Sequence, residues 1–325
     1  MKKIMILATG GTIASSGRPG ATTDYNVGVL IDSLLDSVPG LDKLADVDAE
    51  RVLNIGSSDM KRKDWLTIAK RINTLAMDTG IDGFVVTHGT DTMDETAYFL
   101  NLVVKTNKPV VLTGAMRPAT AMSADGPLNL YQAVLLATQP EAAGKGVMVA
   151  FADGFYNGRD VQKITSSKVS AFGGREYGSM GIIRGDHVFF LNQSTKKHTL
   201  GTEFDISDLE ELPKVSVAYF SVDDDPGVLD YMAAHNDGLV LAGCGGAAVS
   251  SAWRDALHEI TKDGYPVIRS TRVGNGVTVY EAKRDGNYGS IPALTLPPQK
   301  AKVLLMLALT VTRDKAEITR IFETY

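Results

Sequence analysis

Two segments of the chain share a pattern of continuous apolar residues that ends in threonine and glycine. The first covers residues 4–12 and the second covers residues 84–91. Because a continuous apolar run bounded by glycine is typical of a strand buried on both faces, each segment predicts a central strand of a parallel sheet. Ligands bind beyond the carboxyl ends of such strands. We therefore expect Thr12 and Thr90, which lie at the carboxyl ends of the two runs, to share one crevice.

Helical and strand patterns alternate through the first half of the chain. Apolar residues fall on one helical face over 65–76, with Lys and Arg opposite, and helical patterns also cover 95–102 and 128–137. Residues 109–113 and 146–152 predict further buried strands. This alternation favours a doubly wound, mostly parallel α/β sheet with right-handed crossovers.

The second half of the chain repeats the alternation on a smaller scale. Short strands are predicted over 215–220, 239–242 and 267–270, and helices over 227–235, 250–262 and 299–310. The last helix follows two prolines, which can start a helix but cannot continue a strand. We predict a second, smaller α/β domain with a parallel sheet.

A polar, charged stretch with little apolar periodicity separates the two halves and is interpreted as a linker over 192–212. A chain of 325 residues is long for a single core, which also favours two domains. The predicted organisation is an N-terminal catalytic domain over 1–191, this linker, and a C-terminal domain over 213–325.

Composition narrows the classes of partner. The chain is 44% hydrophobic and 22% charged with a formal net charge of -5, so it lacks the basic footprint expected for nucleic acid or an anionic membrane. The single cysteine, Cys244, excludes an internal disulfide, and the five histidines show no metal-ligand spacing with it. We expect a small-molecule ligand and no metal or redox role.

The beginning of the chain bears on its location. The first predicted strand starts almost at Met1, and no apolar run approaches the roughly 20 residues that span a bilayer. We expect a cytoplasmic protein for the chain as written, or a periplasmic one for a chain from which a signal peptide has been removed.

The glycine-rich turn after the first strand does not fit nucleotide binding. Residues 8–14 contain neither the G-x-G-x-x-G fingerprint nor the lysine of a P-loop. Taken alone, Gly10 and Gly11 are compatible with a plain sharp turn, and Thr12 with a helix cap.

The second turn points to nucleophilic chemistry. A threonine hydroxyl is a weak nucleophile until a neighbouring group accepts its proton, and a carboxylate with a lysine can form such a relay. Thr90 is followed at once by Asp91, and Lys163 follows another predicted strand. A lysine in a desolvated pocket can act as a base, although most lysines are solvated surface charges.

Several long strings give the chain a resemblance along nearly its whole length to the bacterial type II L-asparaginases. They cover residues 8–14, 87–93, 95–100, 122–127, 129–131, 298–301 and 308–310. The resemblance implies a hydrolase that removes ammonia from the side-chain amide of L-asparagine through a covalent acyl-enzyme intermediate, without a cofactor. The residues alone do not decide which threonine attacks first.

The resemblance also assigns roles to individual residues. Thr12 is the implied nucleophile, supported by Tyr25 from a flexible loop over 17–26 that could act as a lid, and Thr90, Asp91 and Lys163 form the implied second catalytic group. Backbone N–H groups near Gly89 and Thr90 are placed to hold the oxyanion. The implied substrate-binding residues are Gly11, Ser57, Ser58, Gly89, Thr90, Asp91 and Glu281.

Three positions depart from the commonest type II pattern. Ser58 replaces a frequent glutamine, Ala248 replaces an asparagine or serine, and Lys283 replaces a glutamate whose role Glu281 could take. Because a longer substrate depends more on contacts to its amino-acid head group, we expect weak activity on glutamine.

Three alternatives and an assembly follow. A broad-specificity glutaminase-asparaginase is the main alternative; an amidotransferase subunit acting on aminoacylated RNA would call for an added domain and a basic surface, and a silent amino-acid-binding module would need only some of the catalytic residues. The resemblance implies a homotetramer built from two dimers, with Glu281 acting in a neighbour's site.

Overall fold

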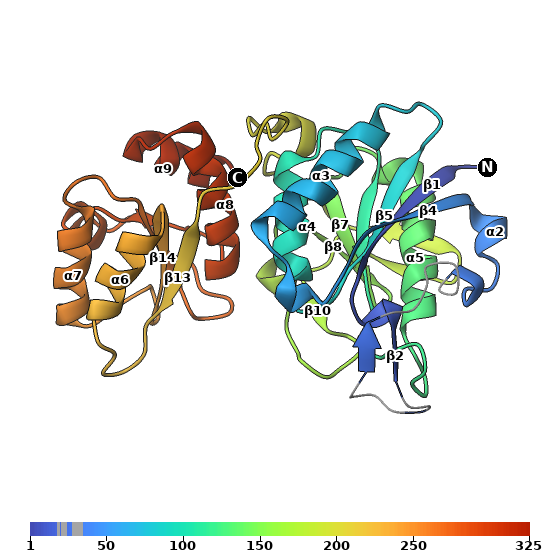
Figure 1. Cartoon of the computed structure of the whole chain (residues 1–325), viewed down its shortest axis with the longest axis horizontal. Helices are drawn as coiled ribbons and strands as arrows, with labels where there is room; N and C mark the ends of the chain where they lie inside the picture. The colour runs from blue at the N-terminus through green and yellow to red at the C-terminus, as the bar shows by residue number, and fades with distance from the viewer. Residues whose placement is uncertain (18–19, 21–24, 28–34) are drawn as a thin grey trace. The chain divides into compact units, whose positions relative to one another are not determined.

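Two units make up the structure, a computed structural model that describes residues 1–17, 20, 25–27 and 35–325. They are Met1–Asp208 and Leu209–Tyr325, and each is built around a sheet of its own (Figure 1). The boundary falls inside the stretch 192–212. Before that boundary, Phe204 and Ile206 are buried, and the Lys105 ammonium donates to the Thr202 carbonyl at 2.9 Å and to its hydroxyl at 2.7 Å. These contacts attach the end of unit 1 to its helical layer.

The sheet of unit 1 has eight strands in the described part of the chain. In spatial order they are β12 (His187–Phe190), β11 (Gly181–Arg184), β8 (Gly154–Asn157), β7 (Val147–Phe151), β6 (Val110–Thr113), β5 (Gly83–Thr87), β1 (Lys3–Gly10) and β4 (Asp46–Ile55). Strands β4, β1, β5, β6 and β7 run parallel. The predicted mostly parallel sheet is therefore confirmed, with β5 and β1 as adjacent interior strands and β1 next to the edge strand β4.

Helices cover both faces of this sheet (Figure 1). They are α2 (Leu41–Leu44), α3 (Arg62–Ala76), α4 (Met93–Val103) and α5 (Gly126–Thr138), with short 3-10 turns η3 (Pro140–Ala142), η4 (Arg175–Tyr177) and η5 (Thr199–Gly201). Helices α3 and α4 pack on one face, and α2 and α5 on the other. The start of α3 is fixed by Asp64, whose carboxylate accepts the Lys61 N–H at 2.8 Å, so a helix predicted from residue 65 begins three residues earlier.

Antiparallel strands complete one edge of the sheet. Strand β8 returns from β7 through Ala152 and Asp153, both with positive φ (49° and 66°), as a tight two-residue hairpin requires. Strands β11 and β12 pair as a second hairpin in which Ile182 lies opposite Phe189. Both of those side chains are exposed. These short strands, and the polar edge strand β4, were not predicted because their apolar runs are short or interrupted by polar residues.

Unit 2 is a smaller sheet whose four strands are all parallel. They are β13 (Val215–Tyr219), β14 (Gly238–Gly243), β15 (Val267–Thr271) and β16 (Ile291–Pro292), accompanied by α6 (Gly227–His235), α7 (Ser251–Thr261), η6 (Ala282–Gly286), α8 (Pro298–Val311) and α9 (Lys315–Thr324). Helices α6 and α7 lie on the opposite side of the sheet from α8 and α9 (Figure 1). The predicted strands and helices are present within two residues of their expected bounds, whereas β16 and α9 were not predicted.

A buried ion pair organises one end of unit 2. The Arg269 guanidinium donates to both oxygens of the Asp285 carboxylate, at 2.8 and 2.7 Å, and both side chains are inaccessible to solvent or nearly so. Arg269 also donates to the carbonyls of Gly246 and Val279. Gly246 lies in the loop after β14, and Val279 and Asp285 lie in the segment after β15. Arg269 therefore holds these two loops together.

No helix in the described part of the chain is both long enough and apolar enough to cross a bilayer.

Candidate active site

The backbones that follow β1 and β5 touch each other. The parallel register pairs Ala8 with Thr87, so both strands end at the same edge of the sheet. There Gly11 has a φ of 82°, and a Cβ added to it would lie 2.4 Å from the Cα and the nitrogen of Gly89. No side chain fits between the Gly11 and Gly89 backbones, and a φ of 82° is unfavourable for residues with a Cβ. Only glycine therefore suits position 11. Because Thr12 follows Gly11 and Thr90 follows Gly89, this backbone contact brings the two threonines close together.

Thr12 begins a short 3-10 turn, η1 (Thr12–Ala14), and is half-buried. A small hairpin follows, in which Gly17 of β2 (Ser15–Gly17) pairs with Tyr25 of β3 (Tyr25–Val27). Strand β3 contacts η1, which keeps the backbone of Tyr25 beside the turn that carries Thr12. The side chain of Tyr25 and most of the predicted loop 17–26 lie outside the described residues.

A lysine joins Thr90 to Asp91. Lys163 lies in β9 (Gln162–Lys163), which pairs with β10 (Phe172–Gly173). Its ammonium donates to the Thr90 hydroxyl at 2.9 Å and to the Asp91 carboxylate at 2.6 Å. The Lys163 side chain is only 16% exposed, whereas that of Asp91 is 68% exposed. The ion pair therefore has a shielded cation and a carboxylate that remains accessible to a ligand.

Ser57 is tied to the same turn. It begins the short turn η2 (Ser57–Asp59) after β4 and is 6% exposed. Its hydroxyl accepts the Asp91 N–H at 3.2 Å, and its carbonyl accepts the Thr92 hydroxyl at 2.8 Å. A Cβ on Gly89 would lie 2.7 Å from the Ser57 oxygen. The turns after β1, β4 and β5 therefore converge, with Ser58 exposed beside Ser57.

A buried hydrogen-bond chain supports the turn after β5 from behind. The Trp65 indole donates to the Thr96 hydroxyl at 2.9 Å, and this hydroxyl lies 3.0 Å from His88 Nε2. His88 Nδ1 lies 2.7 Å from the Gly89 carbonyl. Because the Gly89 carbonyl can only accept, Nδ1 of the neutral imidazole carries the proton and donates to it. Nε2 then accepts from the Thr96 hydroxyl. The sequence motifs included His88 and Thr96 but gave neither a role.

The remaining predicted positions lie in unit 2 and are described within that unit. Glu281 accepts a hydrogen bond from Arg284 Nη1 at 3.0 Å, and its side chain is 40% exposed. Ala248 exchanges two backbone hydrogen bonds with Cys244, which closes a tight turn after β14. Lys283 is exposed on η6. The structure thus brings together Gly11, Ser57, Gly89, Thr90, Asp91 and Lys163, while Glu281 is held by a partner in its own unit.

Among the described residues, no group of three or more His, Cys, Asp or Glu side chains has the arrangement of a metal site.

Comparisons with known proteins agree over both units. A sequence profile described as "Asparaginase, N-terminal" matches residues 3–196, and one described as "Glutaminase/Asparaginase C-terminal domain" matches residues 214–322. A crystal structure named as a probable cytoplasmic L-asparaginase from Campylobacter jejuni has a TM-score of 0.96 and 46% identity, with 100% of both chains covered. The chain therefore has the predicted α/β fold in both units.

Curated relatives carry related names. The chain is 46% identical to L-asparaginase 2 of Escherichia coli, with 100% of this chain and 94% of that protein covered. It is 45% identical to a probable periplasmic L-asparaginase of Haemophilus influenzae, with 100% of this chain and 93% of that protein covered. It is 41% identical to a glutaminase-asparaginase of Pseudomonas fluorescens, with 100% and 91% covered. The chain belongs to the asparaginase family of hydrolases, as an enzyme of the bacterial type II group.

We predict that His88 makes stability depend on pH. Burial lowers the pKa of His88 from 6.5 to about 4. The unfolded chain therefore takes up this proton first as pH falls, so stability is full above pH 6.5 and is lost as pH falls towards 4. Relative to a His88→Gln variant, the native protein should lose about 3 kcal/mol of its free energy of unfolding as the pH falls from 6.5 to about 4. Urea unfolding at a series of pH values measures the difference, and parallel curves for the two proteins would contradict it.

Proposed function

We propose that the protein hydrolyses L-asparagine to L-aspartate and ammonia through an ester on Thr12. The observation that carries the proposal is the pair of hydrogen bonds from Lys163 to Thr90 and Asp91, on a turn that touches the one preceding Thr12. A hydroxyl nucleophile and a proton-transfer group on opposite sides of one crevice suit acyl transfer from an amide. The names of the relatives support the substrate.

The first half of the site performs the attack. The Thr12 hydroxyl adds to the side-chain amide carbon of asparagine, with Tyr25 as its supporting residue. Negative charge then develops on the amide oxygen, and backbone N–H groups near Gly89 and Thr90 stabilise it. One such donor is worth about 3 kcal/mol in comparable reactions. The hydrogen bond from His88 to the Gly89 carbonyl supports this function because it fixes the orientation of the Gly89–Thr90 peptide.

The second half moves protons. Lys163 donates to the Thr90 hydroxyl, which makes that hydroxyl a better proton donor to the departing nitrogen. Lys163 then restores the proton to Thr90 and regains one from solvent, which takes up the proton that Thr12 releases in the attack. Asp91 keeps the ammonium in place. Ammonia leaves, and the same group guides the water that hydrolyses the Thr12 ester. No cofactor enters this sequence of steps.

Head-group recognition uses the remaining polar atoms of the turns. Lys163 occupies one oxygen of Asp91, and the carboxylate is exposed enough to accept the substrate's ammonium with the other. Ser57 accepts the Asp91 N–H, so its own hydroxyl proton is directed elsewhere and can be donated to the substrate carboxylate. Gly11, Ser58 and Gly89 line the same place, and Glu281 is the proposed contact from unit 2.

Lys163→Met should lower kcat on L-asparagine by about 10²- to 10⁴-fold, because it removes the donor to Thr90 and leaves Asp91 unpaired. Ammonia release under saturating substrate measures this effect. Lys168→Met is the matched control, since Lys168 is an exposed lysine of the following loop and its loss should leave kcat unchanged. Equal activity of the two variants would remove Lys163 from the mechanism.

We also propose that activity on glutamine is weak. Ser58 and Lys283 are exposed, and Ala248 offers a methyl group where the commonest type II pattern has asparagine or serine. Glutamine carries one more methylene, so its amide is kept in line only by strong head-group contacts, and misplacement by about 1 Å can cost 10²-fold in rate. The relatives named glutaminase-asparaginase, at 41% and 39% identity, support the broad-specificity alternative.

The two alternatives differ in kcat/KM. We expect the value for L-asparagine to exceed that for L-glutamine by about 10²-fold, and Ala248→Asn to raise the glutamine value by restoring a polar contact. Ammonia release from both substrates, measured side by side, provides the ratio. Near-equal values in the native protein would favour the broad-specificity enzyme.

Assembly and location are further parts of the proposal. Because Glu281 lies in unit 2, a homotetramer in which it completes a neighbour's site would account for its role. Light scattering of the active enzyme tests this assembly, and a fully active monomer would contradict it. The relatives include proteins named as periplasmic and as cytoplasmic, so the compartment stays a prediction.

A further inference from the structure

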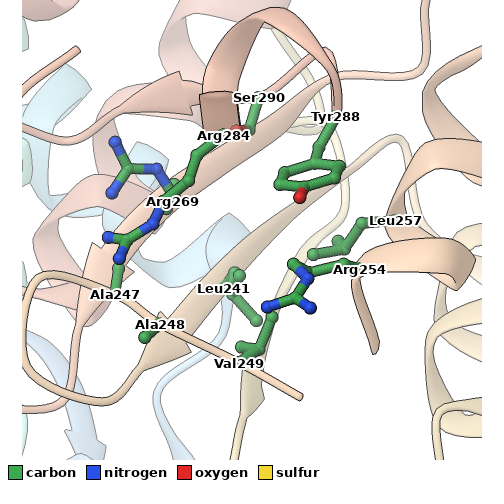
Figure 2. Close-up of a pocket in the computed structure, with 10 residues that line it drawn as sticks. All are labelled: Leu241, Ala247, Ala248, Val249, Arg254, Leu257, Arg269, Arg284, Tyr288 and Ser290. Carbon is green, nitrogen blue, oxygen red and sulfur yellow. The ribbon is translucent and has the colours of Figure 1, made fainter. Parts of the chain in front are cut away.

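Unit 2 contains a pocket with an apolar floor and a cationic rim. Leu241 of β14, Val249 and Leu257 of α7 supply the floor (Figure 2). Figure 2 shows Arg254 and Tyr288 on one side of the opening, and Arg284 with Arg269 on the other. The cavity volume is about 50 Å³, and the pocket widens into open solvent. This size suits a molecule of a few heavy atoms.

The four rim residues differ in how many of their side-chain hydrogen-bond donors already have a partner. Arg269 is saturated by Asp285 and two carbonyls. Arg284 uses Nη1 for the Gly246 carbonyl and for Glu281, so its Nε and Nη2 remain available. The side chain of Arg254 is exposed and has no hydrogen-bond or ion-pair partner among the described residues, and the same holds for the Tyr288 hydroxyl.

The charge of the pocket is not balanced from within. Three of the ten lining side chains are arginines, and no lining side chain is acidic. Asp285 neutralises Arg269 from behind, and Glu281 takes part of Arg284. The full charge of Arg254 therefore faces the opening without an anion. A guanidinium presents donors in a planar fork that matches a carboxylate.

We propose that this pocket binds a small free carboxylic acid with a short aliphatic chain. The carboxylate lies between Arg254 and the free face of Arg284, and the Tyr288 hydroxyl donates to it. The aliphatic chain covers Leu241, Val249 and Leu257. An inorganic anion would pair with the arginines but leave the apolar floor exposed to water. Covering that floor favours an acid of about four carbons. The pocket adjoins the proposed substrate contacts of unit 2, since Ala248 lines it and Arg284 donates to Glu281, but Arg254, Tyr288 and the apolar floor have no role in the proposed hydrolysis.

The bonds around the pocket couple it to two loops. Arg284 and Arg269 both donate to the Gly246 carbonyl, and Gly246 lies in the turn that ends at Ala248. A carboxylate held by Arg284 and Arg254 would join the turn after β14 to the segment 284–290 and to the start of α7. Binding should therefore order these segments relative to one another.

Butyrate titrated into full-length protein with labelled leucine and valine methyl groups provides the direct test. We expect saturable shifts of the Leu241, Val249 and Leu257 methyl signals with a Kd of about 1 mM. Arg254→Gln should weaken binding about tenfold, because it removes a charged donor while leaving an exposed, polar side chain. Arg51→Gln in unit 1 is the matched control, since Arg51 is also exposed and its loss should leave the Kd unchanged.

Three further titrations distinguish the parts of the proposal. Tyr288→Phe should weaken butyrate about fivefold by removing one hydrogen bond, and acetate should bind about tenfold more weakly than butyrate because it lacks two methylenes. Butyramide, which is neutral, should cause no saturable shift. The proposal is overturned if these methyl signals do not respond to butyrate, if Arg254→Gln binds it like the native protein, or if phosphate binds more tightly than butyrate.

Discussion

The two turns that follow β1 and β5 touch at Gly11 and Gly89, and the geometry of the candidate site depends on this contact. A Cβ on Gly11 would come within 2.4 Å of the Gly89 backbone, and one on Gly89 within 2.7 Å of the Ser57 hydroxyl. Three strand ends can converge only because these positions lack side chains. The adjacent parallel register of β1 and β5 brings the turns to one edge of the sheet, where Thr12 and Thr90 extend from a common point.

Polar interactions then give the two sides of this point different chemical character. Lys163 reaches Thr90 and Asp91 from a separate small sheet, while Thr12 begins a turn followed by the hairpin that carries Tyr25. Behind them, Trp65, Thr96 and His88 form a buried chain that ends on the Gly89 carbonyl. In the proposed mechanism, the side that attacks and the side that moves protons are thereby held close together, as amide hydrolysis requires.

Sequence patterns predicted what depends on local burial and missed what depends on distant partners. The central strands and helices α3 to α8 follow from continuous apolar runs and helical spacing. In contrast, β4, β8, β11 and β12 are edge or hairpin strands with mixed patterns. The buried Phe204 and Ile206 lie in a stretch whose polar composition indicated a linker. The contacts of Lys163 and Ser57 join residues 72 and 34 positions from Asp91, a separation that no local pattern encodes. Lys163 was already a candidate from its place after a predicted strand, whereas the roles of Ser57, Tyr25 and Glu281 rested on the family resemblance.

In the proposed mechanism Thr12, and not Thr90, forms the covalent bond with the substrate. Acid quenching during turnover of L-asparagine, followed by proteolysis and mass spectrometry, locates the acyl group directly. We predict an aspartyl ester on the peptide that contains Thr12, absent from a Thr12→Ala variant and retained when Thr90 is replaced by valine. An ester on the Thr90 peptide of the native enzyme would contradict the account and exchange the roles of the two turns.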